Sequence, residues 1–142
     1  MYRIRSSIQV LLGHPGGPFF RNKDEGAWSI PKDEIEPDED PLAAAQREFE
    51  EETGLRPEGP FTELSPVKQK GGKVVHAWAF ESDCDPGTVV SNTFTIEWPP
   101  KSGRQVEFPE IDKAEFFDLD VARTKINSAQ VSLIDELERL VS

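Results

Sequence analysis

The segment from Asp40 to Gly54 carries the clearest helix signal in the chain. Asp40 followed by Pro41 is a typical helix start, because aspartate caps free N–H groups and proline suits the first helical position. Gly54 is suited to end the helix, since glycine adopts the left-handed conformation at little cost. The pattern therefore predicts a helix over residues 41–53.

Three glutamates are expected to converge on one side of this helix. Glu48, Glu51 and Glu52 are spaced as i, i+3 and i+4, so they share a stripe beside the apolar one. They lie near the carboxyl end, where the helix dipole disfavours anions, and Arg47 is the nearby cation. Hard cations such as Mg²⁺ would stabilise such a cluster, because they prefer several carboxylate oxygens. The spacing alone allows two interpretations, a solvated acidic face and a metal site.

The rest of the chain alternates short apolar segments, which predicts a mixed α/β class with more strands than helices. Gly71 and Gly72 predict a hairpin turn between two of the strands. The length of 142 residues suits one domain over residues 1–142. Strands are expected at residues 3–12, 27–30, 61–70, 73–81, 93–98 and 114–119, and further helices at 119–126 and 128–141.

The net charge of −11 excludes several classes of partner. Such a surface repels nucleic-acid backbones and anionic membranes, so neither is expected as a partner. The longest apolar runs are too short for a transmembrane helix or a signal-peptide core, so the cytoplasm is the expected location. A binder of polyphosphates with this charge would need bound cations to invert the local sign.

The spacing of acids before and within the helix resembles the Nudix box, written G-x5-E-x7-R-E-U-x-E-E-x-G-U with U a bulky apolar residue. Glu39 lies eight residues before Arg47, and the segment REFEEETGL follows over residues 47–55. Every defined position after the opening glycine is matched, if Phe49 is accepted as U. The resemblance implies an α/β (α+β) fold, a Nudix-like α/β/α sandwich with a mixed sheet.

The resemblance also implies roles for residues of the helix. Glu51 and Glu52 match the principal pair of metal ligands, and Glu48 matches the third carboxylate, which is a ligand or the catalytic base. Arg47 matches the arginine that holds a glutamate in position, and Glu39 matches the supporting acid of the loop. The implied cofactor is Mg²⁺ or Mn²⁺.

Further ligands are implied outside the helix. The backbone carbonyl of Lys32 matches the oxygen that ligates metal beside the box glycine, and its side chain could contact a phosphate or face solvent. In many members a distal loop supplies another acid, for which Glu110 is the first choice and Glu107 the second. Either acid could equally be an ordinary loop residue.

The implied reaction is a metal-dependent hydrolysis, in which water attacks phosphorus of a nucleoside-diphosphate-linked or related phosphoanhydride. Asp33 departs from the pattern, because it stands where the box has its first glycine. Aspartate tolerates positive φ better than most residues, so the turn could survive. The alternative is a non-catalytic Nudix-like module that binds a nucleotide or a partner.

The identity of the small-molecule substrate and the oligomeric state are left open by the sequence. Gly71–Lys73 occupy the place of a tyrosine that marks many dinucleoside-polyphosphate hydrolases, and Lys70 replaces a proline that marks ADP-ribose members. Lysines at this hairpin could clamp a phosphate or protect an edge strand. His76, Trp78 and Phe80 share one strand face, for which core packing is preferred over a base-stacking platform.

Overall fold

The computed structural model describes residues 1–31, 38–68, 71–72 and 74–141 of the chain. Its centre is an antiparallel sheet in the order β1-β2-β9, formed by Tyr2–Ile4, Ile8–Pro15 and Ile111–Asp118. Backbone bonds from Tyr2 to Phe80 and from Ser82 to Tyr2 add a parallel contact at the β1 edge. The sheet is therefore mixed, as the sequence predicted.

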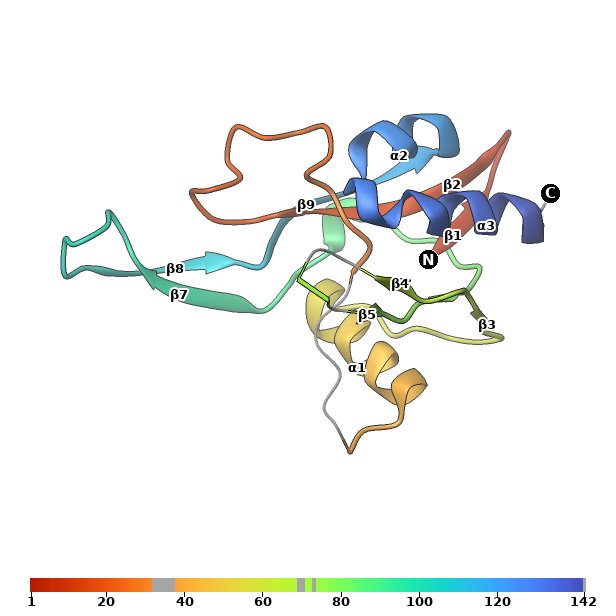
Figure 1. Cartoon of the computed structure of the whole chain (residues 1–142), viewed down its shortest axis with the longest axis horizontal. Helices are drawn as coiled ribbons and strands as arrows, with labels where there is room; N and C mark the ends of the chain where they lie inside the picture. The colour runs from red at the N-terminus through yellow and green to blue at the C-terminus, as the bar shows by residue number, and fades with distance from the viewer. Residues whose placement is uncertain (32–37, 69–70, 73, 142) are drawn as a thin grey trace.

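Strand β2 is covered on both faces, which makes the fold a three-layer sandwich (Figure 1). Val10 and Leu12 face the larger core beneath α2 (Leu119–Lys125) and α3 (Val131–Val141). Leu11, on the opposite face of the strand, packs with Phe49 and Phe80 on the α1 side. Burial on both faces explains why Val10, Leu11 and Leu12 form a continuous apolar run.

Helix α1 spans Pro41–Thr53, the bounds that its local signals predicted. The Asp40 side chain accepts a hydrogen bond from Ala43 N at 3.0 Å, so it is the N-cap. Gly54 has φ of 73° and its N–H donates to the Glu50 carbonyl, which ends the helix in the left-handed conformation. These contacts are local, so the sequence alone sets both ends of the helix.

The remaining strands form three short antiparallel ribbons. They are β3 with β6, β4 with β5, and β7 with β8. Their bounds are Thr62–Glu63 (β3), Val67–Lys68 (β4), Val74–Val75 (β5), Trp78–Ala79 (β6), Thr93–Glu97 (β7) and Gln105–Pro109 (β8). Short 3₁₀ turns occur at Pro86–Thr88 and Ser128–Gln130.

Several expected strands differ from those observed. The strand expected at 3–12 is two strands, because Arg5 N donates to Ser7 O in an intervening turn, and the second continues to Pro15. The segments 61–70 and 73–81 each contain two short strands instead of one. Strand β8 was not anticipated, since prolines and polar residues surround it. None of the helices in the described ranges is long and apolar enough to cross a membrane.

An ion-pair cluster fastens the first strand to the loop after β6. Arg3 and Arg5 bond to separate oxygens of Asp83, which lowers the pKa of that carboxyl group to about 2 from its ordinary 3.8. A carboxylate with a lowered pKa stabilises the fold above pH 3.8, and this contribution is lost as the pH falls through about 2.

Replacing Asp83 by Asn is therefore expected to weaken the acid dependence of stability between these two pH values. The effect should be small, because the ion pairs are exposed to solvent. Urea unfolding at a series of pH values would measure it, with Glu63→Gln on the exposed β3 strand as control. Equal pH slopes in wild type and Asp83→Asn would contradict this interpretation.

Candidate active site

The acidic residues of α1 are divided between its buried and its solvent-facing side. Glu48 and Glu52 are 4% and 8% exposed, whereas Glu51 is partly exposed and Glu50 faces solvent. The three acids were expected to lie beside the buried face of the helix. Two of them, Glu48 and Glu52, instead lie within that face, together with Ala44, Phe49 and Thr53. Two carboxylates one helical turn apart repel each other strongly where water is excluded.

Arg47 ties the loop before the helix to the helix itself. Its Nε and one terminal nitrogen donate to the two carboxylate oxygens of Glu39 at 2.8 and 2.9 Å. Its other terminal nitrogen donates to Glu51 at 3.0 Å. A Glu48 oxygen lies 3.9 Å from the terminal nitrogen that bonds Glu39. These bonds, foremost those to Glu39, raise the pKa of Arg47 above its already high value. The guanidinium therefore holds Glu39 and Glu51 in fixed positions.

The donor set of the helix suits a hard divalent cation. The Glu48 and Glu52 carboxylates are oxygen ligands of the kind that Mg²⁺ and Mn²⁺ prefer, and a cation beside them would relieve their repulsion. Within the described ranges, no three His, Cys, Asp or Glu side chains are already grouped closely enough to hold a metal. The chemistry of the residues fits a cation, although the side chains are not yet gathered round one point.

Of the two distal acids considered, Glu110 is the one at the base of the β7–β8 ribbon beside α1. Glu110 N donates to the Asn92 carbonyl, and Asn92 N donates to the Glu51 carbonyl at the end of α1. Glu107 lies inside β8 with an exposed side chain. The connection through Asn92 favours Glu110 over Glu107 as an additional acid near the helix.

The segment before the box is held from two sides. Ser29 exchanges backbone hydrogen bonds with Gly13 of β2 at 2.8 and 3.0 Å. From the other side, Asn127 N donates to the Trp28 carbonyl and the buried Gln130 side chain accepts from Ile30 N. The chain is thus fixed up to the residues that precede the box. Lys32 and Asp33, for which roles were expected, lie outside the described residues.

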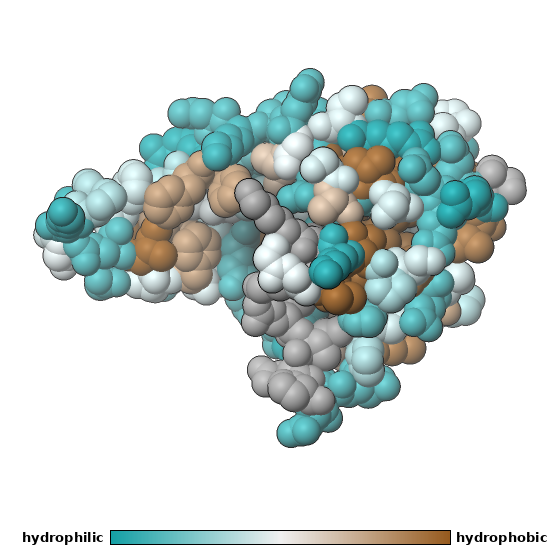
Figure 2. Space-filling model, viewed as in Figure 1, coloured by the Kyte–Doolittle hydropathy of each residue, from teal (hydrophilic) through white to brown (hydrophobic). Residues whose placement is uncertain are grey.

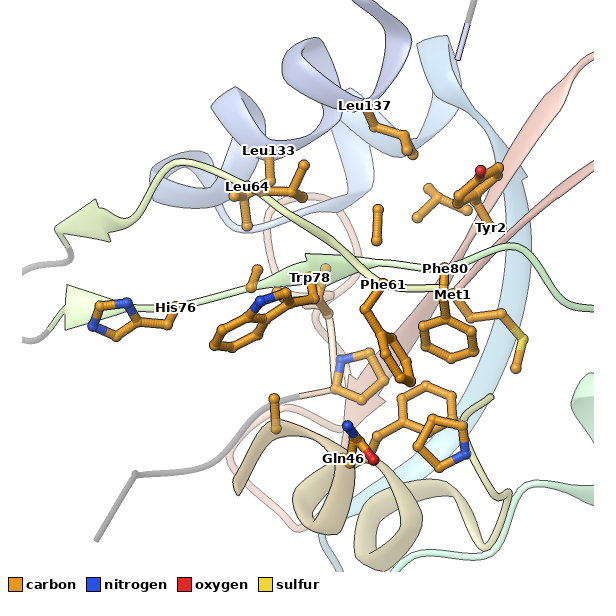
Figure 3. Close-up of a pocket in the computed structure, with 18 of the residues that line it drawn as sticks. Met1, Tyr2, Gln46, Phe61, Leu64, His76, Trp78, Phe80, Leu133 and Leu137 are labelled. Carbon is orange, nitrogen blue, oxygen red and sulfur yellow. The ribbon is translucent and has the colours of Figure 1, made fainter. Parts of the chain in front are cut away.

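A partly open hollow of about 90 Å³ lies between α1, β6 and α3 (Figure 3). Aromatic side chains of Phe61, Trp78 and Phe80 line it, and Glu48 and Gln46 contribute the α1 side. Pockets that enclose a nucleotide-sized ligand have volumes of roughly 300 Å³ or more. The hollow is therefore too small to serve as a base-binding pocket in this conformation.

The expected aromatic strand face is only partly a core face. Phe80 is buried, as core packing predicted, but Trp78 is half-buried and His76 is exposed. The core side of this segment is instead formed by the alternating small residues Val75, Ala77 and Ala79. The alternation of the two faces was predicted correctly, but the face with the larger side chains was expected to be the core face, whereas the face with the smaller ones is buried.

His14 is a buried residue that the sequence analysis did not select. Its Nδ1 lies 2.8 Å from Asp112 Oδ1 of β9, and its Nε2 donates to the Lys23 carbonyl at 2.6 Å. The ring also contacts Trp28 edge-on at 5.2 Å. His14 therefore fastens the loop after β2 to the sheet. The position of His14 at the end of the apolar run of β2 is the sequence feature from which its burial could have been predicted.

Comparisons with known proteins agree with this geometry. A family model described as NUDIX domain matches residues 3–137. The chain is 41% identical over 58 residues to an RNA pyrophosphohydrolase of Roseobacter denitrificans, a match that covers 38% of this chain and 36% of that protein. Among solved structures, a C. elegans Ap4A hydrolase binary complex aligns with a TM-score of 0.67 at 21% identity, over 99% of this chain and 92% of the other.

A second solved structure is the NUDIX domain of Shewanella oneidensis NrtR complexed with ADP ribose. It aligns with a TM-score of 0.64 at 16% identity, over 99% of this chain and 83% of the other. At these identities the two structural matches establish a shared fold and nothing further.

Proposed function

Because the chain belongs to the NUDIX domain family, we propose that it is a metal-dependent hydrolase of a nucleoside-diphosphate-linked or related phosphoanhydride. The observation that carries the proposal is the burial of Glu48 and Glu52 one turn apart, beside the Arg47 clamp on Glu39 and Glu51. The name of one similar protein, an RNA pyrophosphohydrolase, supports the reaction class.

Mg²⁺ or Mn²⁺ is the proposed cofactor, held by Glu48, Glu51, Glu52 and the Lys32 carbonyl, with Glu110 as an additional ligand. When bound, the metal would neutralise charge on the phosphates and lower the pKa of a coordinated water. It would also supply the positive charge that a chain of net charge −11 lacks for an anionic substrate.

The protein's own groups position and deprotonate the attacking water in this proposal. In this proposal the buried Glu48 accepts the proton from that water. Arg47 keeps the Glu51 carboxylate at the edge of the helix, while Glu39 fixes the guanidinium from the loop side. The Lys32 side chain is proposed to contact a substrate phosphate.

The proposal is tested by a product screen with Mg²⁺ or Mn²⁺ over nucleoside triphosphates, dinucleoside polyphosphates, nucleotide sugars, inositol pyrophosphates and 5′-triphosphorylated RNA. We expect turnover of one class with release of a nucleotide or of phosphate, and no turnover in EDTA. In heavy-oxygen water the label should appear on a phosphate of the product, because water attacks phosphorus. Absence of turnover on the whole panel with either metal would refute the hydrolase.

A second candidate function is a non-catalytic nucleotide-binding module. The substitution of the first box glycine by Asp33 favours it, and the NUDIX domain of the similar NrtR structure is complexed with ADP ribose. Asp33→Gly, screened in parallel, separates the two functions. An active wild type supports the hydrolase, whereas an inactive wild type whose Asp33→Gly variant turns over substrate would identify a site switched off by the aspartate.

A further inference from the structure

Strands β7 and β8 form a two-stranded arm that projects from the body of the molecule (Figure 1). In the part of the chain that the structure describes, neither strand pairs with a third one. A two-stranded ribbon is only marginally stable by itself in water, and an open strand edge is a template for pairing with another chain. The arm therefore presents two edges to which a further strand could add.

The hydrogen bonds at both ends of the arm establish which backbone groups face outward. Glu110 N donates to the Asn92 carbonyl, and Trp98 N donates to the Arg104 carbonyl. In an antiparallel ladder, bonded pairs alternate with non-bonded pairs, so even-numbered residues of β7 bond to β8. The N–H and C=O groups of Thr93, Thr95 and Glu97 consequently point away from β8, toward the open edge.

We propose that the open edge of β7 is an interface for a second copy of this chain, paired antiparallel about a two-fold axis at Thr95. In this register Thr95 lies opposite the partner's Thr95, and Thr93 lies opposite the partner's Glu97. Each of these pairs uses the outward backbone groups of both strands. Phe94 of each copy meets Ile96 of the other, a favourable aromatic and β-branched combination.

The side chains explain why the β7 edge fits a second copy and the β8 edge does not. Pairing of β7 with itself places no two like charges opposite each other, because Glu97 faces a threonine. The same operation on β8, centred at Glu107, would place two glutamates directly opposite each other. It would also place Pro109, which has no N–H to donate, in the ladder. The sequence of β7 is thus self-complementary, and that of β8 is not.

The charge distribution is compatible with a second copy of the chain at the β7 edge. Two copies of net charge −11 repel each other, so the contact must bring opposite charges together. The turn at the arm's tip carries the exposed Lys101 and Arg104, and in this register it points toward the base of the other arm, beside the acidic end of α1.

Apolar side chains gather along the arm in Figure 2. They are half-buried on one face of the ribbon, and the Phe19 ring of the preceding loop contacts Trp98 at the end of that face. Pairing would join two such faces into one four-stranded surface, which buries more apolar area than either arm alone. The half-buried strand residues are Phe94, Ile96, Val106 and Phe108.

Sedimentation velocity over a range of protein concentrations tests the interface. We expect a species of twice the 15.9 kDa chain mass for the wild type. Thr95→Pro should convert it to monomer, because proline removes a donor at the centre of the pairing but no bond to β8. Glu107→Pro, the matched change on the other edge of the arm, should leave the dimer intact. A wild type that is monomeric at every concentration, or a dimer that survives Thr95→Pro, would overturn the proposal.

Cross-linking tests the register without depending on a proline variant that could misfold. Residues in a hydrogen-bonded antiparallel pair have Cα atoms about 5.5 Å apart, within the range of a disulfide. Thr95→Cys in a Cys84→Ser background should therefore form a covalent dimer on oxidation, whereas Glu107→Cys in the same background should not. Equal cross-linking of both variants, or of neither, would refute pairing at Thr95.

Discussion

Replacing Glu52 by Gln is expected to lower turnover of the substrate by about 100-fold or more, because the variant loses a charged metal ligand without losing volume. In EDTA the melting temperature of the variant should equal or exceed that of the wild type, since Glu52 lies buried one turn from Glu48 and the substitution removes their repulsion. Thermal melts in EDTA and in Mg²⁺, with steady-state kinetics, measure both effects.

Glu50→Gln is the matched control for this experiment. Glu50 belongs to the same helix and carries the same charge, but it faces solvent. The Glu50→Gln variant should retain turnover. It should also still be stabilised by Mg²⁺, because a ligand that binds only the native state raises the stability of that state. A wild-type melting temperature that ignores Mg²⁺, together with unchanged turnover in Glu52→Gln, would eliminate the metal site at this end of α1.

Replacing Arg47 by Lys should reduce turnover and metal affinity by about 10- to 100-fold, as is usual for residues that orient metal ligands. Lysine keeps the charge but cannot bond both Glu39 oxygens and Glu51 at the same time. The free energy of unfolding should change by only about 0–1 kcal/mol, because the Arg47 side chain is 39% exposed and its ion pairs are screened. Titration of activity with Mg²⁺ and urea unfolding measure the two quantities.

Two comparisons sharpen the test of Arg47. Arg56→Lys changes an exposed arginine just beyond the helix and should have no effect on either quantity. If Arg47 acts through Glu39, the double variant with Glu39→Gln should be no less active than the worse single variant. Additive losses in the double variant, or an Arg47→Lys loss confined to stability, would show that the clamp does not serve the site.

The sequence was informative wherever an interaction is confined to a short segment. The helix from Pro41 to Thr53 depends on Asp40, Pro41 and Gly54, which act within one turn of its ends. The bond between Arg47 and Glu39 is also short in sequence, because Glu39 directly precedes the N-cap Asp40 and Arg47 lies in the second turn of the helix. The apolar alternation along the chain indicated a mixed α/β class, and the resemblance to the Nudix box implied the mixed sheet and the three layers.

What the tertiary structure decided is which of these residues water can reach. Glu48 and Glu52 are both buried, and Glu48 lines the hollow between α1, β6 and α3, whereas helical periodicity treated all three acids of the stripe alike. His14 is buried by a carbonyl nine residues later and a carboxylate on β9. Glu110 is linked to the end of α1 through the backbone of Asn92, where the paired strands β7 and β8 meet the body of the molecule.

The open edge of β7 is also a feature that only the tertiary structure decides, since it depends on which strands pair with one another. Local sequence determines the ends of a helix because its caps are neighbours along the chain. Burial and strand pairing join residues that are distant in sequence, and their free energy depends on every layer of the fold at once. For this protein the sequence therefore determined the helix and the order of its acids, and the packing of distant segments decided their burial and the strands left unpaired.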